Sequence, residues 1–97
     1  MATFLVLTKF TDQGSRNVKD TVGRADSYLE LAKKLGITIK ELYWTLGQYD
    51  VIALAEAADD ESMAALSLSG GALGGVHTQT LRAFSADEMK AIVAKMP

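Results

Sequence analysis

Asp50 and His77 are the two side chains whose types and positions could carry chemistry. Asp50 follows Gly47 closely, in a segment where carboxylates alternate with apolar residues. In a partly apolar pocket the pKa of such a carboxyl is raised, which suits it to proton transfer or to anchoring a ligand. The alternative is structural, because an aspartate next to a turn often binds nearby backbone. We favour the structural interpretation and keep Asp50 as a catalytic candidate.

His77 is the only histidine of the chain and follows the glycine pair Gly74-Gly75. At the mouth of a pocket it could act as a base or as a haem ligand. An exposed or hydrogen-bonded histidine at a strand end is the commoner case, and we favour it. A lone histidine in a chain without cysteine does not make a zinc or iron motif. The sequence therefore predicts no metal site and no cofactor.

Two predicted elements precede the segment that holds Asp50. Residues 3–10 are rich in strand formers and apolar on both faces, which is typical of a strand buried on both sides. A turn at residues 11–14 leads into a predicted helix over residues 15–35. Gly36 ends this helix, because glycine accepts a left-handed C-terminal cap without strain. Apolar residues at spacings of three and four define its buried face: Val18, Val22, Ala25, Leu29 and Ala32.

Residues 37–56 form two strand-like segments around a loop at Gly47. Glycine at the first central position is typical of a two-residue type II′ hairpin loop, which places Trp44 opposite Val51. Alternation of side chains then separates two faces. The face assigned to the helices is apolar: Leu42, Trp44, Leu46, Tyr49, Val51, Ala53 and Ala55. The other face is mixed: Ile39, Glu41, Tyr43, Thr45, Asp50, Ile52, Leu54 and Glu56.

The C-terminal half predicts a helix, a strand and a second helix. The first helix begins at residues 59–61, whose carboxylates suit the positive end of a helix dipole, and it ends in a flexible loop over residues 69–75. This glycine-rich loop lacks phosphate-binding spacing, so we interpret it as a connection or pocket lid. Residues 76–84 form the fourth strand. Ser85 and Glu88 have the spacing of a capping box. The final helix buries four apolar residues: Met89, Ile92, Val93 and Met96.

The predicted order is strand, helix, strand, strand, helix, strand, helix, in one domain over residues 1–97. This is an α+β, ferredoxin-like βαββαβ arrangement with an added C-terminal helix and a four-stranded antiparallel sheet. Its helices lie on one face of the sheet. The other face is too apolar for open solvent and too polar for a dry core, so we expect two copies to pack face to face as a dimeric α/β barrel.

Residues 44–52, WTLGQYDVI, resemble the signature of the GYD family, with Gly47, Tyr49 and Asp50 as the matching residues. Gln48 stands at what we take as the variable position of that signature. The resemblance continues at residues 80–84, TLRAF, and the element order agrees over nearly the whole chain. What the resemblance implies is a dimeric α/β barrel. It carries no catalytic residues over to this chain.

We predict a ligand cavity between the two sheets of the dimer. Its lining comes from six side chains: Tyr43, Thr45, Asp50, Ile52, Thr80 and Arg82. The leading hypothesis is a homodimeric small-molecule-binding or interaction protein. A cofactor-independent or haem-dependent oxygenase or isomerase is the alternative, by analogy of fold alone. A structural assembly unit with a filled cavity is the third. Whether the chain is an enzyme stays open.

Composition excludes several other classes. The net charge is −2 and the 10 Lys and Arg residues are scattered, so we expect no nucleic-acid partner. Absence of cysteine excludes disulfides and thiol catalysis. The longest apolar runs are far shorter than the roughly 20 residues that cross a bilayer. With no signal peptide apparent at the N-terminus, we expect a cytoplasmic protein with no membrane partner.

Overall fold

The computed structural model describes all residues from Met1 to Pro97. The elements in chain order are β1 (Ala2–Phe10), α1 (Asp12–Arg16), a 3-10 turn η1 (Val18–Asp20), α2 (Thr21–Lys34), β2 (Thr38–Trp44), β3 (Val51–Ala57), α3 (Asp60–Ala72), β4 (Val76–Ala83) and α4 (Ala86–Ala94). The predicted α+β fold and element order are confirmed. None of the helices is both long enough and apolar enough to cross a membrane.

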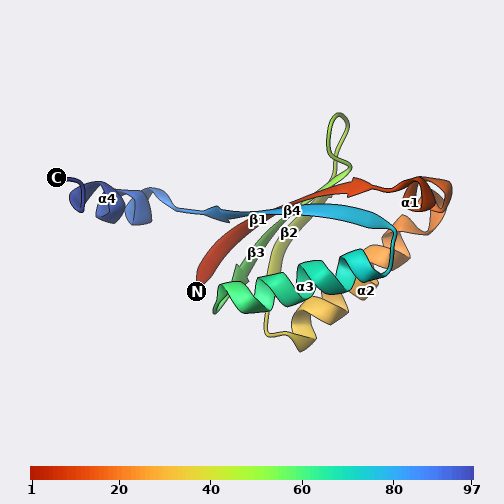
Figure 1. Cartoon of the computed structure of the whole chain (residues 1–97), viewed down its shortest axis with the longest axis horizontal. Coiled ribbons are helices and arrows are strands. Elements are labelled where there is room, and N and C mark those ends of the chain that lie inside the picture. The colour runs from red at the N-terminus through yellow and green to blue at the C-terminus, as the bar shows by residue number, and fades with distance from the viewer.

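The sheet is antiparallel with strand order β2-β3-β1-β4. Helices α2 and α3 cover one face of it and leave the other free of helices (Figure 1). The core lies between the helices and the covered face, where small alanines of β3 let the helices approach. Its buried members are Phe4, Val6, Ala32, Ile37, Ala53, Ala55, Ala57, Met63 and Leu66.

The helix predicted over residues 15–35 is divided in the structure. Helix α1 begins earlier, because the Thr11 hydroxyl caps it by accepting a hydrogen bond from the Gly14 N–H at 3.1 Å. Asn17 ends α1, with its side-chain amide donating to the Gln13 carbonyl. The predicted buried face is also partly wrong, since Val22 is 61% exposed. The face that packs on the core includes Tyr28, Leu31, Ala32 and Leu35.

The hairpin keeps the predicted register, with Trp44 opposite Val51, but the two-residue loop is wrong. The strands end at these two residues, and residues 45–50 form a longer connection. A bulge between Ile39 and Glu41 shifts the pairing by one residue. Because of this shift Ile39 packs against the core instead of facing the mixed side as predicted.

Helix α3 begins as predicted but continues through the glycines that were expected to form a loop. The Asp59 carboxylate caps its N-terminus by accepting a hydrogen bond from the Ser62 N–H at 2.8 Å. Hydrogen bonds from the Ser62 side chain and from its N–H lower the pKa of Asp59. The helix ends before Gly74, whose φ of 80° is the left-handed conformation that glycine tolerates. Only this last part of the glycine segment acts as a stop.

Helix α4 projects away from the domain at the end of β4 (Figure 1). The predicted capping box is confirmed: Ser85 and Glu88 exchange hydrogen bonds, and the bond from the Ser85 N–H is the main cause of a lowered Glu88 pKa. Burial of its apolar side chains is wrong for the single chain, because the arm has no neighbouring element. Met89 is 49% exposed and Val93 is 52% exposed. The arm accounts for the long 51 Å dimension of the chain.

Candidate functional site

An apolar row crosses the helix-free face of the sheet. Leu5 lies at its centre, paired with Leu54 of β3 on one side and with Leu81 of β4 on the other. Leu7 is paired with Ile52 in the same way. Polar and charged positions surround this row: Glu41, Glu56, Lys9, His77 and Gln79. An apolar centre with a polar rim is the usual anatomy of a protein interface.

The β2–β3 connection rises beside this face (Figure 1). The Thr45 N–H donates to the Asp50 carbonyl at 2.8 Å, and the Thr45 hydroxyl donates to the Tyr49 carbonyl at 2.7 Å. The Tyr49 hydroxyl reaches β4 and donates to the Gln79 side chain at 3.0 Å. Tyr49 therefore lies over the helix-free face, and its predicted place among the helix-facing residues is wrong.

The Asp50 side chain binds backbone at the junction of three segments. Its carboxylate accepts a hydrogen bond from the Phe10 N–H at 2.8 Å. The Asp50 N–H donates to the Thr8 carbonyl at 2.8 Å, so the start of β3 is held against the end of β1. These are the contacts that the structural interpretation of Asp50 predicts.

The six residues predicted to line one cavity do not share a face of the sheet. Tyr43 and Ile52 are cross-strand partners on the helix-free side. Thr80 points to the opposite side, where its hydroxyl lies 3.1 Å from the Ser67 hydroxyl of α3. The cause is the β1–β4 register, which pairs Thr80 with the buried Val6 and Arg82 with the buried Phe4.

Arg82 also lies far along β4 from the β2–β3 loop, so it does not contact Asp50. Its guanidinium is 3.5 Å from the Glu88 carboxylate and 4.5 Å from the centre of the Phe84 ring. It also donates to backbone carbonyls of Thr3 and Ala83. These contacts tie the end of the sheet to the first turn of α4.

His77 is exposed at the start of β4, opposite Lys9 of β1. It takes part in none of the ion pairs of the chain. No group of three His, Cys, Asp or Glu side chains is placed to hold a metal ion. The structure thus brings neither Asp50 nor a second ligating group to His77.

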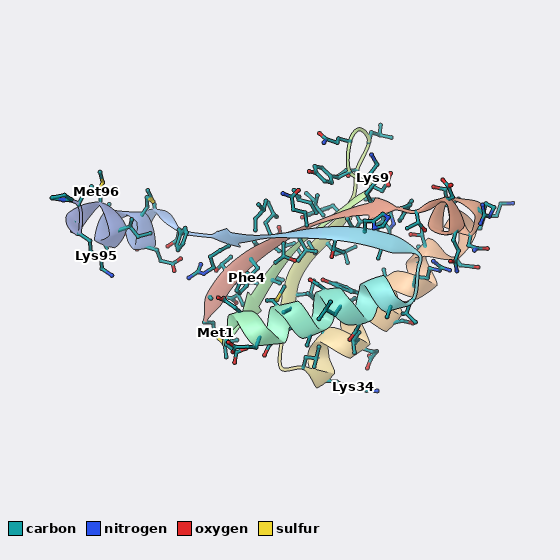
Figure 2. All side chains as sticks on the ribbon, in the orientation of Figure 1. Met1, Phe4, Lys9, Lys34, Lys95 and Met96 are labelled. Atoms are coloured by element: carbon teal, nitrogen blue, oxygen red, sulfur yellow. The ribbon has the colours of Figure 1, made fainter.

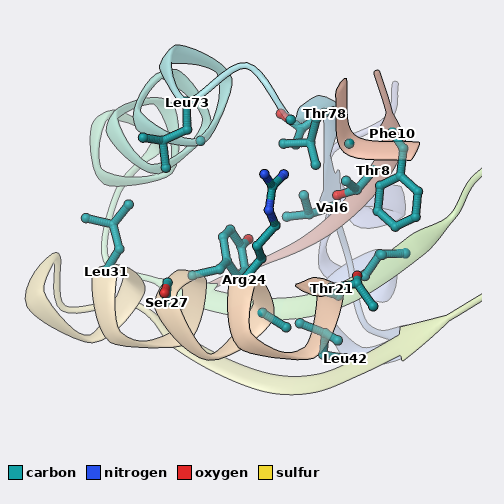
Figure 3. A pocket seen from close by; sticks show the side chains of 18 of the residues that line it. Val6, Thr8, Phe10, Thr21, Arg24, Ser27, Leu31, Leu42, Leu73 and Thr78 are labelled. Carbon is teal, nitrogen blue, oxygen red and sulfur yellow. The ribbon is translucent and has the colours of Figure 1, made fainter. Parts of the chain in front are cut away.

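A cavity of about 370 Å³ lies on the other side of the sheet, between the strands and the helices. Sequence reasoning missed it. Thr8 and Thr78, which are neighbours in the β1–β4 register, stand on its sheet side together with Val6 (Figure 3). The sequence did contain an indication of the cavity, because Thr8 has the same parity as Phe4 and Val6 in β1 and so lies on the same face of the sheet. A hydroxyl where a large apolar side chain is expected leaves room under the helices.

Helix α2 supplies the opposite wall. Tyr28 lines the cavity, and its buried hydroxyl has no hydrogen-bond partner. Burial raises the pKa of Tyr28 to about 12. Trp44 closes one end, where its indole N–H donates to the Thr21 hydroxyl at 2.9 Å. Arg24 rises from α2 toward the space between Leu73 and Thr78 (Figure 3).

Comparison with known proteins identifies the family. The GYD domain matches residues 4–93. The chain belongs to the GYD family. A relative from Thermus thermophilus, named glutamine synthetase and cystathionine beta-lyase binding protein, is 34% identical over 84 residues. That match covers 86% of this GYD chain and 88% of the relative.

Two solved structures share the fold. The crystal structure of TTHA0845, also from Thermus thermophilus, has a TM-score of 0.57 and 30% identity, and the match covers 89% of this chain and 96% of that one. The crystal structure of FFRP-DM1 has a TM-score of 0.60 at 20% identity, covering 87% of this chain and 100% of that one. The second likeness bears on the fold alone, and both support the ferredoxin-like arrangement of the GYD chain.

Proposed function

We propose that this GYD protein is a self-associating binding module, in which the helix-free faces of two copies pack together and the assembly binds a partner protein. The observation that carries the proposal is the apolar row around Leu5. Its members are partly exposed in the single chain, and polar groups that suit an interface rim frame it.

A second copy is the occupant that best fits this face. Only 11 of the 97 residues are buried in the single chain, so much of its apolar surface has no packing partner within that chain. Two twisted sheets can pack face to face at about 10 Å with their leucines interleaved. A twofold axis places the same row on both sides, which makes the contact self-complementary.

The α4 arm is a second unpaired apolar surface of the same chain. Met89, Ile92, Val93 and Met96 recur at spacings of three and four, so they form one stripe. The arm extends beyond its own sheet and reaches no element there (Figure 2). In the proposed assembly it packs against the second copy.

A protein partner is supported by the relative, whose name states that it binds glutamine synthetase and cystathionine beta-lyase. At 34% identity over most of both chains, a related binding role is the natural proposal for this chain. The protein-binding role is tested by passing the two enzymes over the immobilised wild-type chain. Both enzymes are purified from the organism that encodes this chain. We expect at least one to be retained. If neither enzyme is retained at micromolar concentration, the protein-binding role is overturned.

A further inference from the structure

The cavity between the sheet and the helices has the size and the lining of a ligand-binding site. The space of about 370 Å³ is partly open to solvent, since Arg24, Ser27 and Leu73 of its lining are exposed, and its walls lack many packing contacts. The volume lies within the range of small-molecule sites, roughly 300–1,000 Å³. The lining is mostly apolar, with 12 hydrophobic residues among 22. An apolar body is therefore the first requirement for an occupant.

Polar side chains line the cavity from both of its walls. The hydroxyls of Thr8 and Thr78 stand on the strands, and Tyr28 stands on α2. The Tyr28 hydroxyl is the one buried side-chain polar atom of the chain without a hydrogen-bond partner. A buried hydroxyl without a partner is costly. Tyr28 lines the cavity, so an occupant that reached its hydroxyl would supply the missing bond.

Arg24 adds a positive charge to the cavity wall. Its guanidinium lies against the backbone of Gly75, where a Cβ atom would overlap it. Glycine at this position is therefore what admits the Arg24 side chain. Arg24 takes part in none of the ion pairs of the chain. A planar guanidinium without a partner beside an apolar cavity is suited to bind a carboxylate through two hydrogen bonds.

We propose that this cavity binds a small monocarboxylate with an apolar body, its carboxylate on Arg24 and its body against Val6, Leu42 and Ala53. This inference goes beyond the proposed function and does not depend on it. The cavity and the association surface lie on opposite faces of the sheet. Each can fail in experiment without the other.

Titration of the full chain with octanoate and octanamide, followed by amide NMR shifts, tests the inference. The two probes share the apolar body and differ in charge. We expect octanoate to shift the amides of Arg24, Tyr28 and Gly75, and to bind at least fivefold more tightly than octanamide. Absence of octanoate binding at millimolar concentration would overturn the inference, as would shifts confined to the helix-free face or to α4.

Two variants test the role of the guanidinium. Arg24→Gln should reduce the preference for octanoate over octanamide to near onefold. Gly75→Ala should do the same by displacing the Arg24 side chain while leaving its charge in place. Arg16→Gln is the matched control, because Arg16 is exposed on α1 and does not line the cavity. An unchanged preference in Arg24→Gln, or an equal loss in Arg16→Gln, would contradict the proposed carboxylate site.

Discussion

The Phe10 N–H donates to the Asp50 carboxylate at 2.8 Å, across 40 residues of sequence. This bond fixes the last residue of β1 to the residue that precedes β3. The Asp50 N–H is bonded in turn to the Thr8 carbonyl, so both the side chain and the backbone of Asp50 are held. Asp50 thus joins the two central strands, β1 and β3, at the end of the sheet where the β2–β3 loop leaves it.

Replacement of Asp50 by alanine should destabilise the fold. The Phe10 N–H then loses a charged acceptor in a partly buried place, which costs about 1.5–3 kcal/mol of unfolding free energy. Asp50→Asn keeps an acceptor oxygen of the same reach and should lose less than half as much. Urea unfolding of both variants measures the difference. Equal stability of Asp50→Ala and the wild type would remove the structural role assigned here.

Gly14→Ala should destabilise the domain at the contact between α1 and the α3–β4 connection. A Cβ at Gly14 would overlap the Gly75 carbonyl oxygen, which is backbone and cannot rotate away. We expect a loss of about 1–3 kcal/mol, as for other overpacked sites. Gly23→Ala is the control, because nothing lies within 4 Å of the added atom and the site is helical. That variant should gain about 0.5–1 kcal/mol.

Tyr28 should make the fold sensitive to alkali. Burial raises its pKa from 10.0 to about 12. As pH rises through this range, the unfolded chain releases the phenolic proton before the folded chain does, so the unfolding free energy falls. The loss attributable to Tyr28 is roughly 2–3 kcal/mol. Tyr28→Phe should lack it.

Chemical unfolding of the wild type and Tyr28→Phe, in parallel series from neutral pH to the alkaline end of that window, measures the effect. The other two tyrosines are present in both proteins and cancel in the comparison. At neutral pH the variant should be at least as stable as the wild type, because it removes a buried hydroxyl without a partner. Parallel stability curves at all pH values would show that Tyr28 is not buried as described.

The α4 arm should contribute to assembly through one stripe only. Val93→Glu places a charge in the apolar stripe and should raise the dissociation constant of self-association at least tenfold. Ala91→Glu introduces the same charge at an exposed position outside the stripe and should leave association nearly unchanged. Light scattering over a dilution series distinguishes the two. Equal behaviour of the two variants would exclude the stripe from the interface.

Local signals were readable from the sequence because neighbouring residues suffice to form them. The Ser85–Glu88 capping box involves four consecutive residues, and the structure contains it. The pairing of Trp44 with Val51 followed from strand alternation around one glycine. It survived because the longer connection, residues 45–50, has the same centre, Gly47 and Gln48, as the predicted two-residue loop.

Features that depend on contacts between residues far apart in the chain could not be predicted from the sequence. The side of the sheet to which Thr80 points depends on its pairing with Val6, 74 positions away. The residues of β4 alone do not predict it. The bulge beside Lys40 moved Ile39 to the core without a glycine or proline to mark it. The cavity could be read only in part: the parity of Thr8 places it on the covered face, but its meeting with Thr78 depends on the β1–β4 register. Each is a tertiary relationship rather than a local pattern.

Sedimentation equilibrium of the wild type, Leu81→Glu and Val22→Glu is the most direct test of association through the helix-free face. Leu81 ends the apolar row, whereas Val22 is equally apolar and exposed on α2. The wild type and Val22→Glu should sediment at a multiple of the 10.4 kDa chain mass at micromolar concentration, and Leu81→Glu as the single folded chain. A wild type that sediments at the mass of one chain would contradict the association proposed here.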